Sequence, residues 1–234
     1  MNAPLPHAVL LHGVNATSRS MEPLAAGLRK HATVHIPNLP GHGGRPIPER
    51  MSIQDTGVEM LQLLDDQGIE RAWFVGYSLG GYTATWLAHN HPDRVLGVCT
   101  LATRFTFTPE IVSHWTHLAQ PERIQRNSPA RAAELLRSHG PDWPRLSFAN
   151  AAMFEELDRN PPLTLDDLKA LTRPVMLVNG NRDAFLPWVH TLEMGKVIPG
   201  AKLVMFYGIA HPIMNVPTAQ VAEAIGQWMR NPKP

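Results

Sequence analysis

The sequence predicts an α/β protein with a mostly parallel sheet of about six strands flanked by helices. One observation behind this prediction is that short apolar runs alternate with helix-like segments along the chain, a pattern typical of strands joined by crossover helices. A second is the stretch Gly76–Gly81, in which a serine between glycines separates an apolar run from a helix-like run. With 234 residues, 44% of them hydrophobic, the chain suits one domain with an ample core.

Six apolar runs have the length and composition of strands. They cover residues 8–11, 33–36, 72–75, 96–101, 174–178 and 202–206. Helical spacing of apolar residues predicts helices between and after these runs. They are expected through 21–28, from the capping pattern at Ser52 to about residue 67, over 79–91 and over about 217–229.

The alternation stops between residues 104 and 172. This stretch is rich in aromatic side chains and has helix-like pieces around 110–118 and 130–138. Because it interrupts two strands, we expect a small helical cap at 104–172, inserted into a core formed by 1–103 and 173–234. A longer crossover connection is the alternative. The aromatic residues are expected to be core residues first, and only some of them would face a ligand.

The overall charge and composition exclude several classes of protein. Lys plus Arg total 21 and Asp plus Glu total 20, so the net charge of +1 offers no basic field for nucleic acid. No apolar run approaches the roughly 20 residues of a membrane span. The lone cysteine, Cys99, lies in an expected buried strand and is interpreted as a packing thiol. Together with an N-terminus that lacks signal-peptide features, this predicts a cytoplasmic protein.

Ser78 is the candidate nucleophile. A serine with glycines two residues before and after it, placed between a strand and a helix, fits a sharp turn that exposes the hydroxyl in strained backbone geometry. Glycine is needed on both sides because a Cβ would collide where the strand and helix approach. The alternative is an ordinary surface Gly-Ser turn, so the interpretation depends on whether Ser78 has partners.

A serine hydroxyl needs a positioned base, and the base needs an orienting acid. Asp183 follows the strand at 174–178, whereas the slot after residue 101 has no carboxylate until Glu110. Of the two histidines after Asp183, His211 directly follows the last strand, while His190 is at the start of an expected helix. The sequence therefore predicts a Ser78, Asp183 and His211 triad in the chain order of nucleophile-elbow enzymes.

The triad also needs donors for the oxyanion of a tetrahedral intermediate. We expect the backbone amides of Leu79, at the helix start, and of Val14, in the loop after the first strand. His12 is interpreted as a loop-packing residue and His42 as part of a turn near the pocket mouth. Neither a metal site, a phosphate loop nor a dinucleotide fingerprint is recognised, so no cofactor is expected.

Together these motifs resemble the α/β-hydrolase superfamily, in its cap-bearing esterase-like branch. The resemblance covers nearly the whole chain and is weakest in the cap. Its carriers are His12-Gly13, residues 38–43, residues 76–81, residues 180–183 with Pro187, and residues 208–212. Members usually have an N-terminal hairpin, and because the first apolar run begins at residue 8, the sheet is expected to lack its first two strands. Asn38 and Arg45 replace the Asp and Ser of the family's loop, which calls its usual bracing hydrogen bonds into question.

The resemblance implies a cofactor-free serine hydrolase that cleaves a small or medium carboxylic ester through an acyl-enzyme. The same triad would also serve a thioesterase or a carbon–carbon bond hydrolase, and the latter would need cationic pocket groups such as Arg104 or Arg173. A ligand receptor that retains the triad is the non-enzyme alternative. The expected partner is a small acyl ester. The oligomeric state is not predicted.

Overall fold

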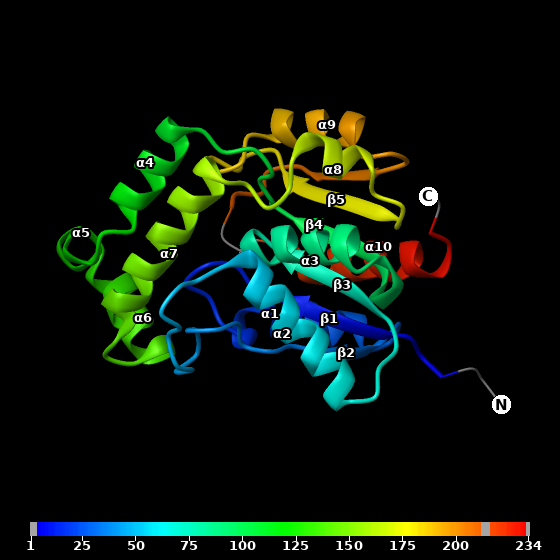
Figure 1. The fold of residues 1–234 in the computed structure, drawn as a ribbon, viewed down its shortest axis with the longest axis horizontal. Helices are drawn as coiled ribbons and strands as arrows, with labels where there is room; N and C mark the ends of the chain where they lie inside the picture. The colour runs from blue at the N-terminus through cyan, green and yellow to red at the C-terminus, as the bar shows by residue number, and fades with distance from the viewer. Residues whose placement is uncertain (1–3, 212–215, 233–234) are drawn as a thin grey trace.

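A computed structural model describes residues 4–211 and 216–232 and confirms the α/β class (Figure 1). One sheet has the strand order β2-β1-β3-β4-β5-β6, and all five neighbouring pairs are parallel. Each strand lies within two residues of its predicted bounds. The strands are β1 (His7–Leu11), β2 (Thr33–His35), β3 (Ala72–Tyr77), β4 (Val95–Leu101), β5 (Val175–Gly180) and β6 (Lys202–Phe206).

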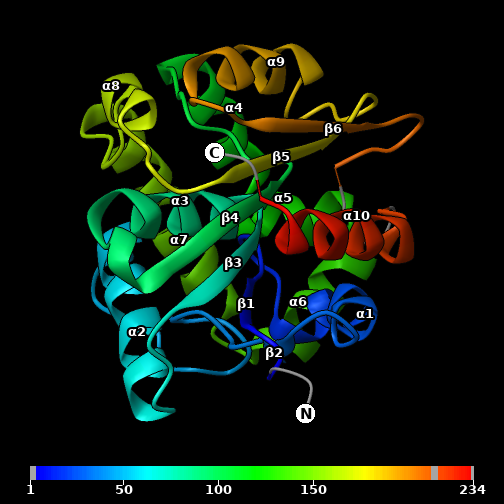
Figure 2. The same ribbon diagram turned by 90° about the vertical axis from the view of Figure 1, so that its right-hand side faces the viewer.

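Helices cover both faces of this sheet. On one face, α1 (Ser18–Leu28) packs against α10 (Thr218–Arg230). The opposite face is covered by α2 (Ile53–Asp66), α3 (Leu79–Asn90) and α9 (Trp188–Val197). Figure 2 shows α1 and α10 on one side of the strands and α2 and α3 on the other. A short 3-10 turn, Pro92–Arg94, leads into β4.

The two faces follow from the alternation of side chains along each strand. In β1, Ala8 and Leu10 belong to the core cluster under α1 and α10, whereas Val9 and Leu11 belong to the cluster under α2 and α3. All four side chains are fully buried. A strand buried on both faces carries a continuous apolar run, which is why these strands could be recognised in the sequence.

Five helices lie between β4 and β5 in the chain. They are α4 (Pro109–Leu118), α5 (Pro121–Asn127), α6 (Pro129–His139), α7 (Trp143–Arg159) and α8 (Leu165–Lys169). Figure 1 shows α4 to α7 grouped beyond one end of the sheet, with α8 close to β5 and α9. α4 packs against α7, and α5 packs against α6. Leu146, Met153 and Leu157 of α7 join the α2–α3 core cluster, so this inserted segment is bound to the sheet by shared apolar packing.

The sequence predicted α4 and α6 but missed α5, α7 and α8. α5 begins at Pro121, and α7 has Pro144 in its first turn. Proline is usually a sign that a helix ends, yet in the first turn it removes only an amide hydrogen that would be unbonded anyway. Pro121 and Pro144 are therefore compatible with the first turns of α5 and of α7, the longest helix of the group.

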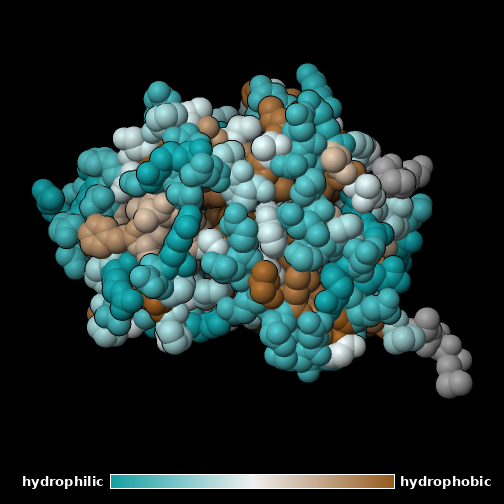
Figure 3. All heavy atoms as spheres, in the orientation of Figure 1, coloured by the Kyte–Doolittle hydropathy of each residue, from teal (hydrophilic) through white to brown (hydrophobic). Residues whose placement is uncertain are grey.

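The surface is mainly hydrophilic on the face shown in Figure 3, where hydrophobic residues form small separate spots. This mixture matches a chain whose charges nearly balance. None of the helices in the described residues combines the length and apolar character that crossing a membrane requires. The cytoplasmic location and the absence of a nucleic-acid partner stay predictions.

The first turn of α3 lies directly against the backbone of β1 and β3. A Cβ on Gly80 would overlap the carbonyl oxygen of Leu11, and one on Gly76 would overlap the backbone of Gly80. Backbone atoms cannot move aside as flexible side chains can, so both positions require glycine. The strand–turn–helix unit around Ser78 thus depends on close backbone packing, as the sequence predicted.

We expect Gly80→Ala to destabilise the protein by more than about 3 kcal/mol, because it forces apart a buried strand and helix. Urea unfolding measured by circular dichroism would give the free energy of unfolding. Gly68→Ala is the matched control, since Gly68 has open space around it and only its φ of 64° is unfavourable to alanine. Gly68→Ala should lower the free energy of unfolding by about 1 kcal/mol. Equal losses in the two variants would contradict this account of Gly80.

Candidate active site

Ser78 occupies the turn between β3 and α3 in a strained conformation. Its φ of 52° and ψ of −117° are unusual for a residue with a side chain. Three neighbours hold this geometry: the Ser78 amide donates to the carbonyl of Leu101 at 2.7 Å, and the Ser78 carbonyl accepts from the amide of Gly81 at 3.0 Å and from Thr103 Oγ1 at 2.9 Å. The half-buried side chain lines a pocket.

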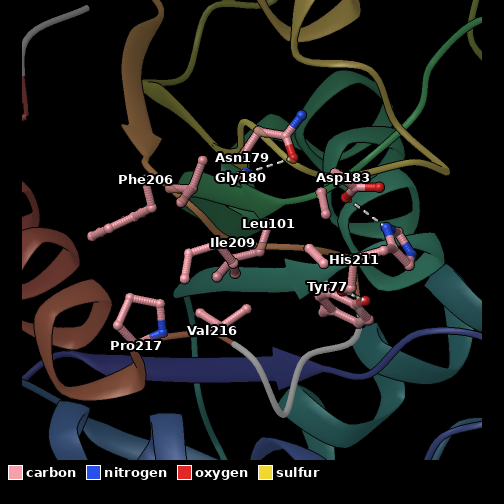
Figure 4. A pocket seen from close by; sticks show the side chains of 13 residues that line it. Tyr77, Leu101, Asn179, Gly180, Asp183, Phe206, Ile209, His211, Val216 and Pro217 are labelled. Carbon is pink, nitrogen blue, oxygen red and sulfur yellow. Dashed lines mark hydrogen bonds and ion pairs between the residues drawn. The ribbon is translucent and has the colours of Figure 1, made fainter.

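Asp183 and His211 are joined as the sequence predicted. His211 Nδ1 donates to Asp183 Oδ2 at 2.7 Å (Figure 4). The other oxygen, Oδ1, accepts from the amides of Phe185 at 2.9 Å and Leu186 at 2.7 Å. The Asp183 side chain is only 2% exposed, and that of His211 is 21% exposed. With its Nδ1 proton bonded to the carboxylate, a neutral His211 has its acceptor at Nε2, the tautomer that a general base needs.

Ser78 and His211 line the same pocket, but no hydrogen bond joins their side chains among the described atoms. In enzymes without bound substrate, catalytic hydrogen bonds are often long and shorten when the substrate binds. The structure therefore pairs the acid with the histidine and brings the serine into their pocket without bonding it to them.

The two predicted oxyanion donors lie on either side of the turn. Leu79 is the first residue of α3, and Val14 follows β1, the strand next to β3. The β1 loop is close to the serine, because a Cβ on Gly13 would lie 3.2 Å from the Cβ of Ser78. Within residues 4–211 and 216–232, neither the Leu79 nor the Val14 amide donates to another group. Both amides are thus available to a ligand.

The pocket beside Ser78 is mainly aromatic and has space of about 290 Å³, part of it open to solvent. Phe107, Trp115 and Phe154 of the inserted segment line it, with Phe185 from the loop after β5. Trp115 is the centre of this wall, with its ring centroid 5.3 Å from that of Phe154 and 6.0 Å from that of Phe107. Of the two cationic candidates in the sequence, Arg104 lines the pocket and Arg173 does not.

A second pocket also has His211 among its lining residues (Figure 4). It is lined by Tyr77, Phe206, Ile209 and Val216 among others, and Ser78 is not one of its lining residues. The pocket that contains Ser78 is therefore the candidate substrate site.

Tyr77 contacts His211 and was not identified as a site residue from the sequence. Its hydroxyl donates to the backbone carbonyl of His211, and the two ring centroids are 5.4 Å apart. A tyrosine immediately before the nucleophile is the only signal that could have indicated this contact, because the partner is 134 residues away.

Three further histidines are buried together, and one of them, His42, lies in a turn as the sequence predicted. His12, His42 and His139 form this cluster, with ring centroids 5.1 and 5.6 Å apart, and the buried His42 side chain is not among the described residues that line the Ser78 pocket. His12 Nδ1 donates to the Gly13 carbonyl at 2.8 Å, and its Nε2 accepts from the Leu39 amide at 3.0 Å. This confirms His12 as a loop-packing residue.

Both His12 and His42 are held neutral by their contacts. His42 Nδ1 donates to the Pro40 carbonyl at 2.8 Å, and its Nε2 accepts from the Asn15 amide at 3.2 Å. A proton on Nε2 of His42 would point at the N–H group of Asn15, so protonation would break this hydrogen bond. Burial lowers the pKa of His12 to about 4, and burial together with the neighbouring His12 lowers the pKa of His42 to about 3. Among the described residues, no three His, Cys, Asp or Glu side chains could hold a metal ion.

His190 is also placed away from the serine, as predicted. It lies in α9 and accepts from the Phe105 amide at 3.0 Å through Nε2. Burial, with a smaller contribution from the positive charge of Arg104, lowers the pKa of His190 to about 4. Nε2 of His190 thus holds the backbone at Phe105, where the chain enters the inserted segment.

The loop at residues 38–45 is braced despite its unusual residues. Asn38 Oδ1 accepts from the Ser18 amide at 2.7 Å, and Arg45 donates to the Asn38 carbonyl at 2.6 Å. Arg45 also pairs with Glu59 of α2. The two replacements thus supply bracing hydrogen bonds of their own.

Comparison with known families agrees with this geometry. The sequence model of the family described as alpha/beta hydrolase fold matches residues 6–161. The chain belongs to this family. It is therefore an enzyme of the α/β-hydrolase class, with similarity to esterases.

Several relatives are similar over most of the chain. The pimeloyl-[acyl-carrier protein] methyl ester esterase of Vibrio vulnificus is 25% identical, over 88% of this chain and 87% of the relative. The biotin biosynthesis bifunctional protein BioHC of Cellvibrio japonicus is 26% identical over 89% of this chain, which spans 44% of that longer protein. The crystal structure of the enol-lactonase from Burkholderia xenovorans superposes with a TM-score of 0.81 at 21% identity, covering 98% of this chain and 93% of that one.

The neutral histidine pair predicts a loss of stability in acid. Between pH 6.5 and about 4 the unfolded chain binds protons at these histidines and the folded chain does not, so the free energy of unfolding falls as the pH falls. Each histidine contributes a slope of up to about 1.4 kcal/mol per pH unit in this window. Urea unfolding at pH 8, 6 and 5 would measure it.

His42→Gln should flatten this slope by about the share of one histidine, because the substitution removes one site that protonates only on unfolding. The exposed His114, on α4, provides the control variant His114→Gln, which should leave the slope unchanged. A wild-type slope in His42→Gln would mean that His42 is not held neutral.

Proposed function

We propose that the protein is a cofactor-free serine hydrolase that cleaves a small or medium carboxylic ester through an acyl-enzyme. Ser78 is the proposed nucleophile, His211 the general base and then the general acid, and Asp183 the group that orients His211. The observation that carries the proposal is that His211, bonded to Asp183, lines the same pocket as the half-buried Ser78 in its strained turn.

In the proposed reaction, Ser78 Oγ attacks the ester carbonyl carbon while His211 Nε2 takes its proton. The carbonyl oxygen becomes an oxyanion that accepts from the Val14 and Leu79 amides, and the positive end of α3 also stabilises it. The intermediate then expels the alcohol, which receives the proton from His211. A water molecule, deprotonated by His211, attacks the acyl-enzyme, releases the acid and restores Ser78.

The pocket supports a substrate of modest size. Its space of about 290 Å³ includes open solvent, so the enclosed part is smaller still, and aromatic rings line it. We propose that residues 104–172 act as the cap over this site, since Phe107, Trp115 and Phe154 come from that segment. The esterase of Vibrio vulnificus acts on an ester according to its name, and this supports an ester as the substrate class.

Carbon–carbon bond hydrolysis is the second candidate, because it needs a cation in the pocket and Arg104 lines the pocket. Arg173 is excluded from this role since it pairs with Asp93 at 3.4 Å outside the pocket. Thioester hydrolysis would use the same acyl-enzyme. Ester hydrolysis is favoured over both by the esterase relative.

Hydrolysis of p-nitrophenyl esters of increasing acyl length tests the proposal. We expect Ser78→Ala to lower kcat/KM by at least about 10³-fold and Asp183→Asn by a similar factor, the latter because His211 loses its required tautomer. Ser113→Ala and Asp166→Asn, at exposed positions of α4 and α8, are matched controls that should retain activity.

Folding of each variant would be checked by circular dichroism, so that a lost fold is not taken for a lost nucleophile. Full activity in Ser78→Ala would contradict the role of Ser78. Full activity in Asp183→Asn would mean that another acid orients His211.

A further inference from the structure

Among the described residues that line the Ser78 pocket, Arg104 is the only lysine or arginine, and none is acidic. Asp183 is bonded to His211 and is not one of these lining residues. The other polar side chains of the described lining already have a proposed catalytic role or a hydrogen-bond partner. Ser78 and His211 belong to the proposed triad, and the buried Tyr82 hydroxyl contacts the backbone of Leu163. Among the described lining residues, Arg104 is therefore the polar side chain still free to bind part of a substrate.

The guanidinium group is held in place but mostly unpaired. Its Nη2 donates to the Phe185 carbonyl at 3.2 Å, and its central carbon lies 5.7 Å from the centroid of the Trp115 ring. Nε is buried and has no hydrogen-bond partner within the described residues. A guanidinium has five N–H donors, so one bond to a carbonyl leaves most of them for a ligand.

No carboxylate of the described chain neutralises this charge. Arg104 forms no ion pair within residues 4–211 and 216–232, in contrast to Arg173, which pairs with Asp93. Asp183 is near enough to raise the pKa of Arg104, against the larger effect of burial, which lowers it. Both Asp183 oxygens, however, already accept from His211 and from two backbone amides. A half-buried cation without an ion pair favours an anionic ligand.

The position of Arg104 separates it from the oxyanion site. Val14 follows β1, Ser78 follows β3 and Arg104 follows β4, and these strands are neighbours in that order. A substrate whose carbonyl oxygen lies at the Val14 side would extend past Ser78 toward Arg104 along the aromatic wall. The rings suit an apolar chain or ring, and the guanidinium suits a planar carboxylate at its end.

We propose that Arg104 binds a carboxylate of the substrate, so that the preferred substrate is an ester of a compound that also has a free carboxylate. This inference rests on the proposed esterase function and adds its substrate class. Arg104 is a binding residue here and takes no part in bond breaking. The carboxylate can belong to the acyl part or to the alcohol part of the ester.

Two matched substrate pairs distinguish these sources. For the acyl part, mono-p-nitrophenyl glutarate is compared with p-nitrophenyl pentanoate, which has the same number of acyl carbons. For the alcohol part, 4-carboxyphenyl butyrate is compared with phenyl butyrate. We expect the wild-type enzyme to prefer the carboxylate-bearing ester of one pair by at least about 10-fold in kcat/KM, mainly through a lower KM.

Arg104→Gln should reduce that preference ratio by at least about 10-fold, and Arg104→Lys should retain part of it, because lysine keeps the charge but not the planar fork. Arg173→Gln, outside the pocket, is the control that should keep the wild-type ratio. The absence of a preference in both pairs, or a preference that survives Arg104→Gln, would overturn the inference.

A binding measurement separates this inference from the esterase proposal. The two carboxylate-bearing esters would be titrated by calorimetry into Ser78→Ala and into the double variant with Arg104→Gln. We expect one of the two esters to bind at least about 10-fold more weakly to the double variant than to Ser78→Ala. If each ester bound the two variants equally well, the inference would be overturned even if no ester is hydrolysed. Conversely, Ser78-dependent hydrolysis of the neutral esters without any preference would leave the esterase proposal standing alone.

Discussion

The contact between the first turn of α3 and the backbone of β1 is the constraint on which the site depends. Gly76 and Gly80 have no room for a Cβ, so strand, turn and helix approach until their backbones touch. The approach forces Ser78 into a positive φ, which costs about 1–3 kcal/mol by itself. Two hydrogen bonds offset that cost: the Ser78 amide donates to the Leu101 carbonyl, and Thr103 Oγ1 donates to the Ser78 carbonyl. The backbone of Ser78 is therefore fixed before a substrate arrives, and only the side-chain torsion has still to be set.

Strand order then determines which groups meet the serine. The chain adds β2 on one side of β1 and β3 on the other, so the strand order reverses between β1 and β3, although all the strands are parallel. In open parallel sheets the loops at such a point diverge and leave a crevice. The β1 loop brings Val14 to one side of Ser78, and the β4 and β5 loops bring Arg104 and Asp183 to the other. His211 follows β6, the edge strand, and reaches back to Asp183. Four loops far apart in sequence thus meet at one edge of the sheet.

The sequence was sufficient for the parts that depend on local pattern. Short, mainly apolar runs and their alternation with helical patterns identified all six strands, and chain order selected Asp183 and His211, which the structure joins by a hydrogen bond. Contacts between distant residues left no such pattern. The amide of Gly43 donates to His139 from 96 residues away, so the burial of the histidine cluster could not be anticipated. The direction of Arg104 depends on Trp115 and Phe185, whose packing no periodicity encodes.

The same long-range contacts tie the proposed oxyanion loop to the inserted segment. Asn15, next to Val14, has a φ of 53°, and its side-chain oxygen accepts from Asn150 of α7 at 3.0 Å. Its carbonyl accepts from Arg131 of α6 at 3.1 Å, while its amide donates to His42. Every polar group of Asn15 named here is therefore bonded to a part of the chain outside the β1 loop. It follows that the position of the Val14 amide is determined by α6 and α7 as well as by the sheet, so a movement of these helices would change the oxyanion geometry together with the aromatic wall.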